Sequence, residues 1–280
     1  MEKGEEIDVQ FFASGYCTSH GRIVNPKEGR GIVRFYAVWA LLRHPNFGLM
    51  VFDAGYSGDF ERVTNHWPEW IYGKATPVFL NPKETAVERL AEIGIQSEDI
   101  NYFVVSHFHG DHICAAADFT NAKFICRRDA FEQMQKLNGF QAVRRGILKK
   151  LLPKDFAQRT IILEDISELE VDETTDLEFY SMFKQTDIRF VHLPGHARGM
   201  LGFEFRSAAK KILYATDASW NADAFRRGIK PMRIVKLFFD SWKEFLQTTT
   251  RLKKYASLHP EAVILFTHCP ETLKYLENEV

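Results

Sequence analysis

The chain has 280 residues, of which 45% are hydrophobic and 26% are charged, so its composition is that of a globular protein and not of a disordered one. Its 36 basic and 37 acidic residues leave a net charge of −1, which argues against nucleic acid as the main partner. The longest apolar run, residues 35–42, is too short to span a membrane. The N-terminal MEKGEEID has no secretory-signal pattern, and four widely spaced cysteines form no CxxC pair, so we expect reduced thiols and a cytoplasmic location.

Strand-like and helical segments alternate along both halves of the chain. Apolar runs predict strands at 33–42, 49–53, 100–106, 123–126, 188–193, 201–205, 211–216 and 263–267. Helical spacing of apolar residues predicts helices at 85–93 and 241–258. We therefore expect one domain over residues 1–280, with two sheets sandwiched between layers of helices.

The segment 129–152 differs from its neighbours, because its pattern is helical, basic and interrupted by two glycines. It lies between predicted strands, so we interpret it as a helical insertion that covers the active site. The alternative interpretation is that its charges form a solvated helix face.

The residues SHFHGDH, 106–112, concentrate metal-binding side chains directly after a predicted strand. His107 and His109 are two residues apart, so in an extended segment they face the same way and can bind one ion. Asp111 and His112 follow a glycine, where the chain can turn and direct a second pair of donors to a neighbouring ion. Imidazole nitrogen and carboxylate oxygen suit zinc, with manganese and iron as alternatives.

Further donors lie where other predicted strands end. His196, Asp217 and His268 each follow an apolar run, and strand ends are where a sheet presents catalytic groups. We therefore expect them to complete two metal sites. Asp53 also ends a strand, and we expect it to orient a ligand histidine and not to bind metal itself.

These motifs resemble the metallo-β-lactamase superfamily over nearly the whole chain. They are HxHxDH at 107–112, FDAG at 52–55, LPGH at 193–196, ATDA at 215–218 and FTHC at 266–269, in the order typical of that family. The resemblance implies an α/β fold, a four-layer αβ/βα sandwich of two mixed sheets flanked by helices, with the metal site at one edge.

The resemblance also implies how the donors are shared between two divalent metal ions. One ion would be bound by His107, His109 and His196, and the other by Asp111, His112 and His268. Asp217 would bridge the two ions together with a water or hydroxide, so Asp111 and Asp217 are the predicted catalytic carboxylates.

Within the superfamily, the second half of the chain looks like the N-acyl homoserine lactonases, above all in ATDASWNADAF, residues 215–225. Those enzymes carry a tyrosine three residues after the bridging aspartate, where this chain has Trp220. An indole N–H can donate a hydrogen bond but cannot act as a phenol acid. A second departure is Ala115-Ala116, where family members often have glycines. We predict Trp220, Tyr56 and His20 as substrate-binding residues.

The predicted function is a dinuclear metal-dependent hydrolase that opens a lactone or ester with a metal-bridging hydroxide, like a quorum-quenching lactonase. Aromatic side chains in turn-rich stretches favour a small-molecule substrate with an apolar acyl or aromatic group, and a homodimer is compatible with the sequence. Three alternatives stay open: a phosphodiesterase-type hydrolase, a mono-iron sulfur dioxygenase, and a binding protein with vestigial activity. Flavin-linked di-iron members carry glutamate in place of the second histidine, and His109 argues against that class.

Overall fold

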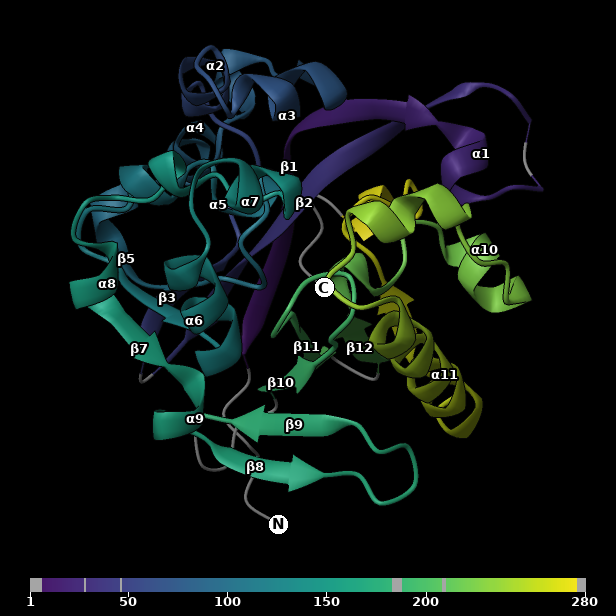
Figure 1. The fold of residues 1–280 in the computed structure, drawn as a ribbon. Helices are drawn as coiled ribbons and strands as arrows, with labels where there is room; N and C mark the ends of the chain where they lie inside the picture. Colours follow the sequence, from purple (N-terminus) through teal and green to yellow (C-terminus); the bar gives the residue numbers. More distant parts are fainter. Residues whose placement is uncertain (1–6, 28, 46, 183–187, 208–209, 276–280) are drawn as a thin grey trace.

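The computed structural model describes residues 7–27, 29–45, 47–182, 188–207 and 210–275. Residues 1–6 of the N-terminal segment considered above lie outside this range. Within it, two mixed β-sheets pack face to face and helices cover their outer faces (Figure 1). The predicted fold class, a four-layer α/β sandwich, is confirmed.

The first sheet has the strand order β4-β1-β2-β3-β5-β6-β7. Its strands are β1 (Asp8–His20), β2 (Ile32–His44), β3 (Gly48–Phe52), β4 (Val78–Phe79), β5 (Ile100–Val104), β6 (Lys123–Cys126) and β7 (Thr160–Ile162). Pairing is antiparallel from β4 to β3 and parallel from β3 to β7.

The second sheet has the order β13-β12-β11-β10-β9-β8. It comprises β8 (Glu168–Val171), β9 (Glu178–Ser181), β10 (Ile188–His192), β11 (Leu201–Ser207), β12 (Lys210–Tyr214) and β13 (Val263–Leu265). Only the β12–β13 pair is parallel among these described strands.

Helices lie along both outer faces. Those of the first half are α1 (Gly21–Val24), α2 (Asp59–Thr64), α3 (Trp70–Ala75), α4 (Ala86–Glu92), α5 (Gly110–Ile113), α6 (Arg128–Lys136), α7 (Gly139–Arg144), α8 (Phe156–Arg159) and α9 (Leu163–Ile166). The second half adds α10 (Ala222–Arg227) and α11 (Trp242–Leu258), which lie to the right in Figure 1. None of the described helices has the length and apolarity that a membrane crossing requires.

The core between the sheets explains the sequence pattern of β2. Val38, Ala40 and Leu42 face the second sheet, whereas Ala37, Trp39 and Leu41 face the helices on the other side. Because this strand is buried on both faces, its sequence is a continuous apolar run and does not alternate between apolar and polar residues. Across the interface, Leu201, Phe203 and Phe205 of β11 alternate inward, and the ring of Phe203 lies 4.8 Å from that of Phe52.

Strand direction brings the predicted donors to one edge. The parallel strands β3 and β5 both end at this edge, immediately before Asp53 and the 106–112 motif. In the second sheet, β12 and the parallel β13 end just before Asp217 and His268. The Leu201 N–H donates to the Ser106 carbonyl at 2.9 Å and so ties the two sheets together beside the motif.

Candidate metal centre

Seven predicted donors meet at the shared edge of the two sheets. Their ligand atoms form three trios in which all atoms lie within 4.8 Å of one another: His107, His109 and His196; His107, His112 and Asp217; and Asp111, His112 and His268. All seven side chains are buried or nearly so. Residues up to 161 positions apart in the chain therefore converge on one small volume.

Asp217 lies between the two outer trios. Its Oδ2 is 3.2 Å from His196 Nε2 on one side and 3.0 Å from His268 Nε2 on the other. Its Oδ1 lies 3.7 Å from His112 Nε2 and has no hydrogen-bond partner. A carboxylate with contacts to both groups is placed to bridge two ions.

Several buried donor atoms at this site have no hydrogen-bond partner, and this indicates whether the residues suit metal ions. Nε2 of His107, Nε2 of His112 and Oδ1 of Asp217 are all buried and make no hydrogen bond. Unpaired buried polar atoms are costly and rare in native proteins, and three of them facing one point suit a cation that takes up their lone pairs. The donor set of imidazole and carboxylate groups fits zinc, manganese or iron.

The second nitrogen of several ligand imidazoles is fixed by the protein. His112 Nδ1–H donates to Asp53 Oδ2 at 2.7 Å, and His268 Nδ1–H donates to the Tyr36 carbonyl at 2.8 Å. The Ser106 hydroxyl lies 2.9 Å from His107 Nδ1. Such bonds set the tautomer and ring orientation, so that Nε2 of each ring faces the centre.

Asp53 has the geometry of an orienting residue. Its side chain is fully buried, accepts the Ser106 N–H at 2.8 Å and contacts His112 but no other donor of the three trios. Its backbone has φ of +61°, an uncommon conformation for a residue other than glycine, and such conformations cluster at functional sites. Burial raises the pKa of its carboxyl, although His112 and Ser106 oppose that rise.

Burial and neighbouring charge divide the histidines into two groups. Burial lowers the pKa of His107 and of His196 well below the ordinary value, so both imidazoles are neutral, which is the form that binds metal. Burial also acts to lower the pKa of His112, but the nearby carboxylates of Asp111 and Asp53 outweigh it and raise that pKa to about 10. Metal binding at His112 therefore has to displace a proton.

The segment 129–152 lies directly against His109. Ile147 forms an isolated β-bridge with His109, and the backbone of Arg145 lies near its ring. Gly146, with φ of +72°, leaves no room for a side chain, because an added Cβ would lie 2.5 Å from His109 Cδ2. The sequence pattern did not predict this backbone contact with His109. It also did not predict the Ser106 hydroxyl beside His107 or the Tyr36 carbonyl at His268.

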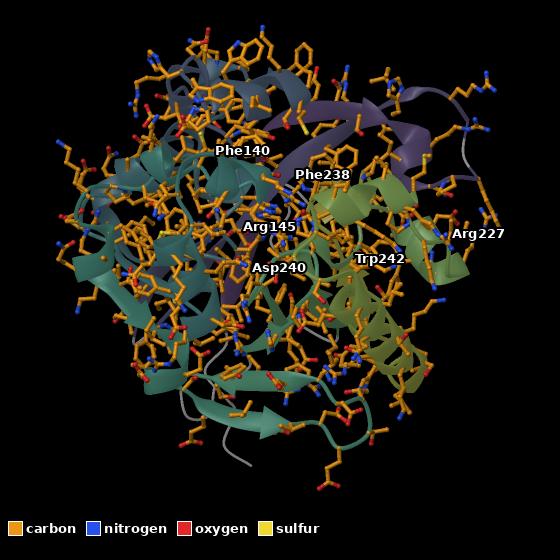
Figure 2. All side chains as sticks on the ribbon, viewed as in Figure 1. Phe140, Arg145, Arg227, Phe238, Asp240 and Trp242 are labelled. Carbon is orange, nitrogen blue, oxygen red and sulfur yellow. The ribbon has the colours of Figure 1, made fainter. Side chains whose placement is uncertain are left out.

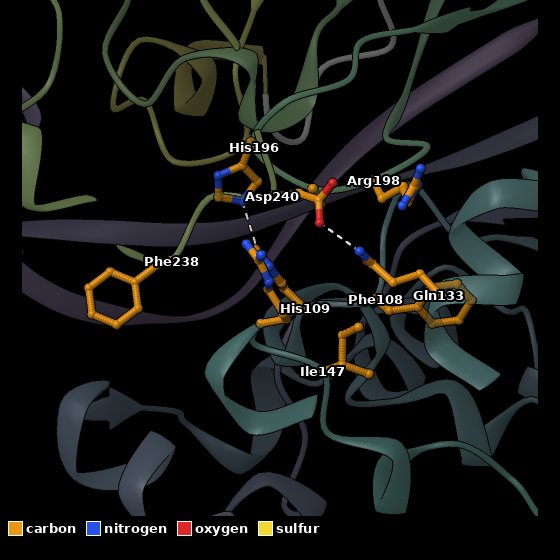
Figure 3. A pocket seen from close by; sticks show the side chains of 10 residues that line it. Phe108, His109, Gln133, Ile147, His196, Arg198, Phe238 and Asp240 are labelled. Carbon is orange, nitrogen blue, oxygen red and sulfur yellow. Dashed lines mark hydrogen bonds between the residues drawn. The ribbon is translucent and has the colours of Figure 1, made fainter. Parts of the chain in front are cut away.

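A small pocket opens beside His109 and His196 (Figure 3). It is also lined by Gln133, Arg198 and Asp240, and Gln133 donates to Asp240 Oδ1 at 2.6 Å. The Arg145 guanidinium donates to the Phe239 carbonyl and so links the segment 129–152 to the residues that follow the 3₁₀ helix η6 (Arg233–Leu237).

Exposed aromatic side chains occur on α7, after η6 and around α3. Phe140 of α7 and Phe238, just after η6, are 55% and 57% exposed, and Figure 2 places both near the labelled Arg145. Trp67 and Trp70 before and in α3 are also exposed. Of the aromatic residues near the N-terminus, by contrast, Phe11 and Phe12 are buried in the core.

The three predicted substrate-binding residues have different surroundings. Trp220 packs edge-on against Phe35 and His196, and its indole N–H donates to Asp217 Oδ2 at 3.2 Å. Tyr56 is 1% exposed, and its hydroxyl has no hydrogen-bond partner. His20 is exposed at the end of β1, where the chain enters α1, and does not belong to the three buried trios.

Known proteins with related sequences match two thirds or more of the chain. The N-acyl homoserine lactonase AttM of Agrobacterium fabrum (strain C58) is 24% identical over 270 residues, 94% of each chain. The AttM lactonase of Azorhizobium caulinodans is 27% identical over 195 residues, 68% of each chain.

Solved structures share the fold. A structure of an N-acyl homoserine lactone hydrolase with the product N-hexanoyl-L-homoserine at its catalytic metal centre has a TM-score of 0.68 at 19% identity and covers 95% of both chains. A probable metal-dependent hydrolase from Staphylococcus aureus has a TM-score of 0.69 at 16% identity and covers 96% of this chain and 91% of its own.

A sequence model described as the metallo-beta-lactamase superfamily matches residues 33–268, which include every donor of the candidate metal centre. The match confirms the predicted family. The chain belongs to the metallo-β-lactamase superfamily and is a metal-dependent hydrolase.

Proposed function

We propose that this protein is a dinuclear hydrolase that opens a lactone or a carboxylic ester, with N-acyl homoserine lactones as the leading substrate class. The observation that carries the proposal is the position of Asp217, whose one carboxylate oxygen lies 3.2 Å from His196 and 3.0 Å from His268. The proposal is supported by curated lactonases at 24% identity that align with 94% of the chain. Zinc is the proposed metal; a cytoplasmic location and a homodimer stay predictions.

The proposed division of ligands follows the trios. One ion would be held by His107, His109 and His196. The other ion would be held by Asp111, His112 and His268, and Asp217 would contact both ions. When bound, two such ions lower the pKa of a water toward neutrality and polarise the substrate carbonyl.

The chain's own residues hold this arrangement in place. Asp217 carries negative charge, because although its burial acts to raise its pKa, His268 and His196 outweigh that effect and lower the pKa well below the usual range. It is therefore a charged carboxylate between the two ligand groups. Trp220 donates to the Oδ2 of this carboxylate and so fixes its orientation. The insertion 129–152 would cover the His109 side and exclude water from it.

The protein has exposed aromatic side chains that an apolar substrate group could contact. Phe238 lines the pocket at His109 and His196, and Phe140 of α7 is a second exposed aromatic side chain near Arg145 (Figure 2). Apolar walls with a few convergent polar groups are typical of small-molecule sites. We propose that an acyl or aromatic group lies against these side chains.

The test uses zinc-loaded protein with verified metal content. Acyl homoserine lactones of several chain lengths and aryl esters are assayed beside a bis-aryl phosphodiester. We expect lactone or ester turnover, two ions per chain, and a fall in kcat of at least about 10³-fold in Asp217→Asn, because the charged shared ligand is lost. Preference for the phosphodiester, or unchanged turnover in Asp217→Asn, would contradict the proposal. Arg227→Gln, an exposed change on α10, is the matched control.

A further inference from the structure

A second cavity lies between the helices α10 and α11, which are neighbours in the fold (Figure 1). Its volume is about 230 Å³, and it shares no lining residue with the pocket beside the candidate metal centre. Its walls are largely apolar, because Phe225 and Phe245 are buried there and Ile229, Pro231 and Leu246 add to the lining. The proposed hydrolysis assigns this cavity no role.

The polar side chains of the cavity fall into two kinds. The hydroxyls of Ser219, Thr249 and Thr250 each donate to a backbone carbonyl of their own segment, at 3.2, 2.8 and 2.9 Å. The other two polar side chains in the lining are those of Lys230 and Lys253. The hydroxyls are therefore engaged within the protein, and the polar groups left for a ligand are two ammonium groups.

Neither lysine has an acidic partner among the described residues. The acidic residue of α10, Asp223, pairs with Arg227 at 3.0 Å. The acidic residue of α11, Glu244, precedes Lys253 by nine positions, which is more than two helical turns. The positive charge of Lys230 and Lys253 is thus uncompensated by the two helices that form the cavity.

Lys253 is held at the rim by the end of α10. A Cβ built at Gly228, the residue that ends this helix with φ of +66°, would lie 2.6 Å from Lys253 Nζ. The absent side chain leaves room for the ammonium group beside the last helical turn, where unpaired carbonyls favour a cation. Because Gly228 and Lys230 are exposed, these charges lie where the cavity meets solvent.

An apolar cavity with a cationic rim matches a ligand that has an apolar body and an anionic end. Its volume is below the roughly 300–1,000 Å³ of sites for drug-sized ligands, so the matching ligand is small. We propose that this cavity binds a small amphiphilic anion, a short acyl chain or an aromatic ring with one carboxylate or phosphate group. The anionic group would contact Lys230 and Lys253, and the apolar part would lie against Phe225 and Phe245. The inference does not depend on the proposed hydrolysis.

The test is isothermal titration calorimetry of the metal-loaded protein with octanoate, octyl phosphate and octanol. We expect an anion to bind at least about 10-fold more tightly than octanol, because a hydrogen bond to a charged group contributes more than a neutral one. The double variant Lys230→Gln/Lys253→Gln should weaken anion binding by at least about 10-fold for the same reason. Lys254→Gln is the matched control, because Lys254 is an exposed neighbour on α11 that does not line the cavity.

Carboxylates also bind metal ions, so a second variant distinguishes the two sites. Thr250→Phe puts a large ring into the cavity and leaves both lysines and the metal ligands in place, and we expect it to weaken anion binding with metal content unchanged. Anion affinity equal to that of wild type in the double lysine variant would mean that the anion binds elsewhere, and the inference is then wrong. Equal affinity for octanol and octanoate, or no binding of either anion, overturns it as well. Tighter binding of one anion than of the other supports it and identifies the headgroup.

Discussion

At the scale of single residues, the candidate metal centre is bordered by groups that we do not expect to bind metal. Asp53 holds both the Ser106 N–H and His112 Nδ1, and so connects the end of β3 to the ligand loop after β5. Its positive φ shows that the backbone bends there to direct the carboxylate inward. Removing such a partner leaves the ligand ring free to rotate and makes its nitrogen less basic.

We predict that Asp53→Asn weakens metal binding by about 10- to 100-fold without preventing folding. Asparagine has the same shape and tolerates positive φ, so the backbone should be retained. Competition with a fluorescent chelator gives the affinity, and circular dichroism checks the fold. An affinity equal to that of wild type would show that Asp53 does not orient His112.

At the scale of elements, the 128–151 region supports the site through its backbone. It is formed by α6, α7 and the 3₁₀ helix η4 (Lys149–Leu151), and residues 145–147 lie against His109. Its two glycines differ in their surroundings, although both have positive φ. Gly146 faces the His109 ring, whereas a Cβ at Gly139 would meet no atom within 4 Å.

These glycines offer a matched pair of substitutions. Gly139→Ala should lower the free energy of unfolding by about 1–2 kcal/mol, the cost of a left-handed conformation for alanine, and Gly146→Ala should lower it by more, because its Cβ also meets the His109 ring. Only Gly146→Ala should also reduce metal content, because its Cβ displaces His109. Urea denaturation and metal analysis of both variants measure the two effects, and equal metal loss in both would refute the role of Gly146.

At the scale of the whole molecule, the candidate metal centre contains residues from both halves of the chain. His107, Asp111 and His112 follow a strand of the first sheet, whereas Asp217 and His268 follow strands of the second. Ions bound here would hold the sheets together at one edge, beside the apolar core that joins their inner faces. Metal binding should therefore stabilise the whole domain.

Removing the metal with a chelator should lower the melting temperature, and zinc should restore it. With free zinc at 100 times Kd the gain is about 2.7 kcal/mol, or roughly 5–10 °C for a chain of this size. We expect His268→Ala to lose this response and His20→Ala, an exposed histidine outside the trios, to keep it. Differential scanning calorimetry checks both; a full response in His268→Ala would mean that His268 is not a ligand.

Several elements were predictable because their signal is local. The strands around 33–42, 49–53 and 123–126 and the helices around 85–93 and 241–258 are confirmed, since continuous apolar runs and helical spacing reflect burial directly. The strand β1 did not appear as a run, because polar residues and a bulge between Ala13 and Tyr16 interrupt it. The short α2 and α3 carry too few turns to produce a periodic pattern.

The sequence by itself determined which residues are candidate donors, because their chemical types and their places at strand ends can be read without coordinates, and the structure brings their ligand atoms together. Only the tertiary structure decided which other groups surround them. The Trp220 indole on Asp217, the Arg145 backbone at His109 and the Tyr72 ring on Gly110 all join segments that are distant in the chain or unremarkable in pattern. Such contacts depend on how separate elements pack, and a linear pattern contains no information about which distant surfaces meet.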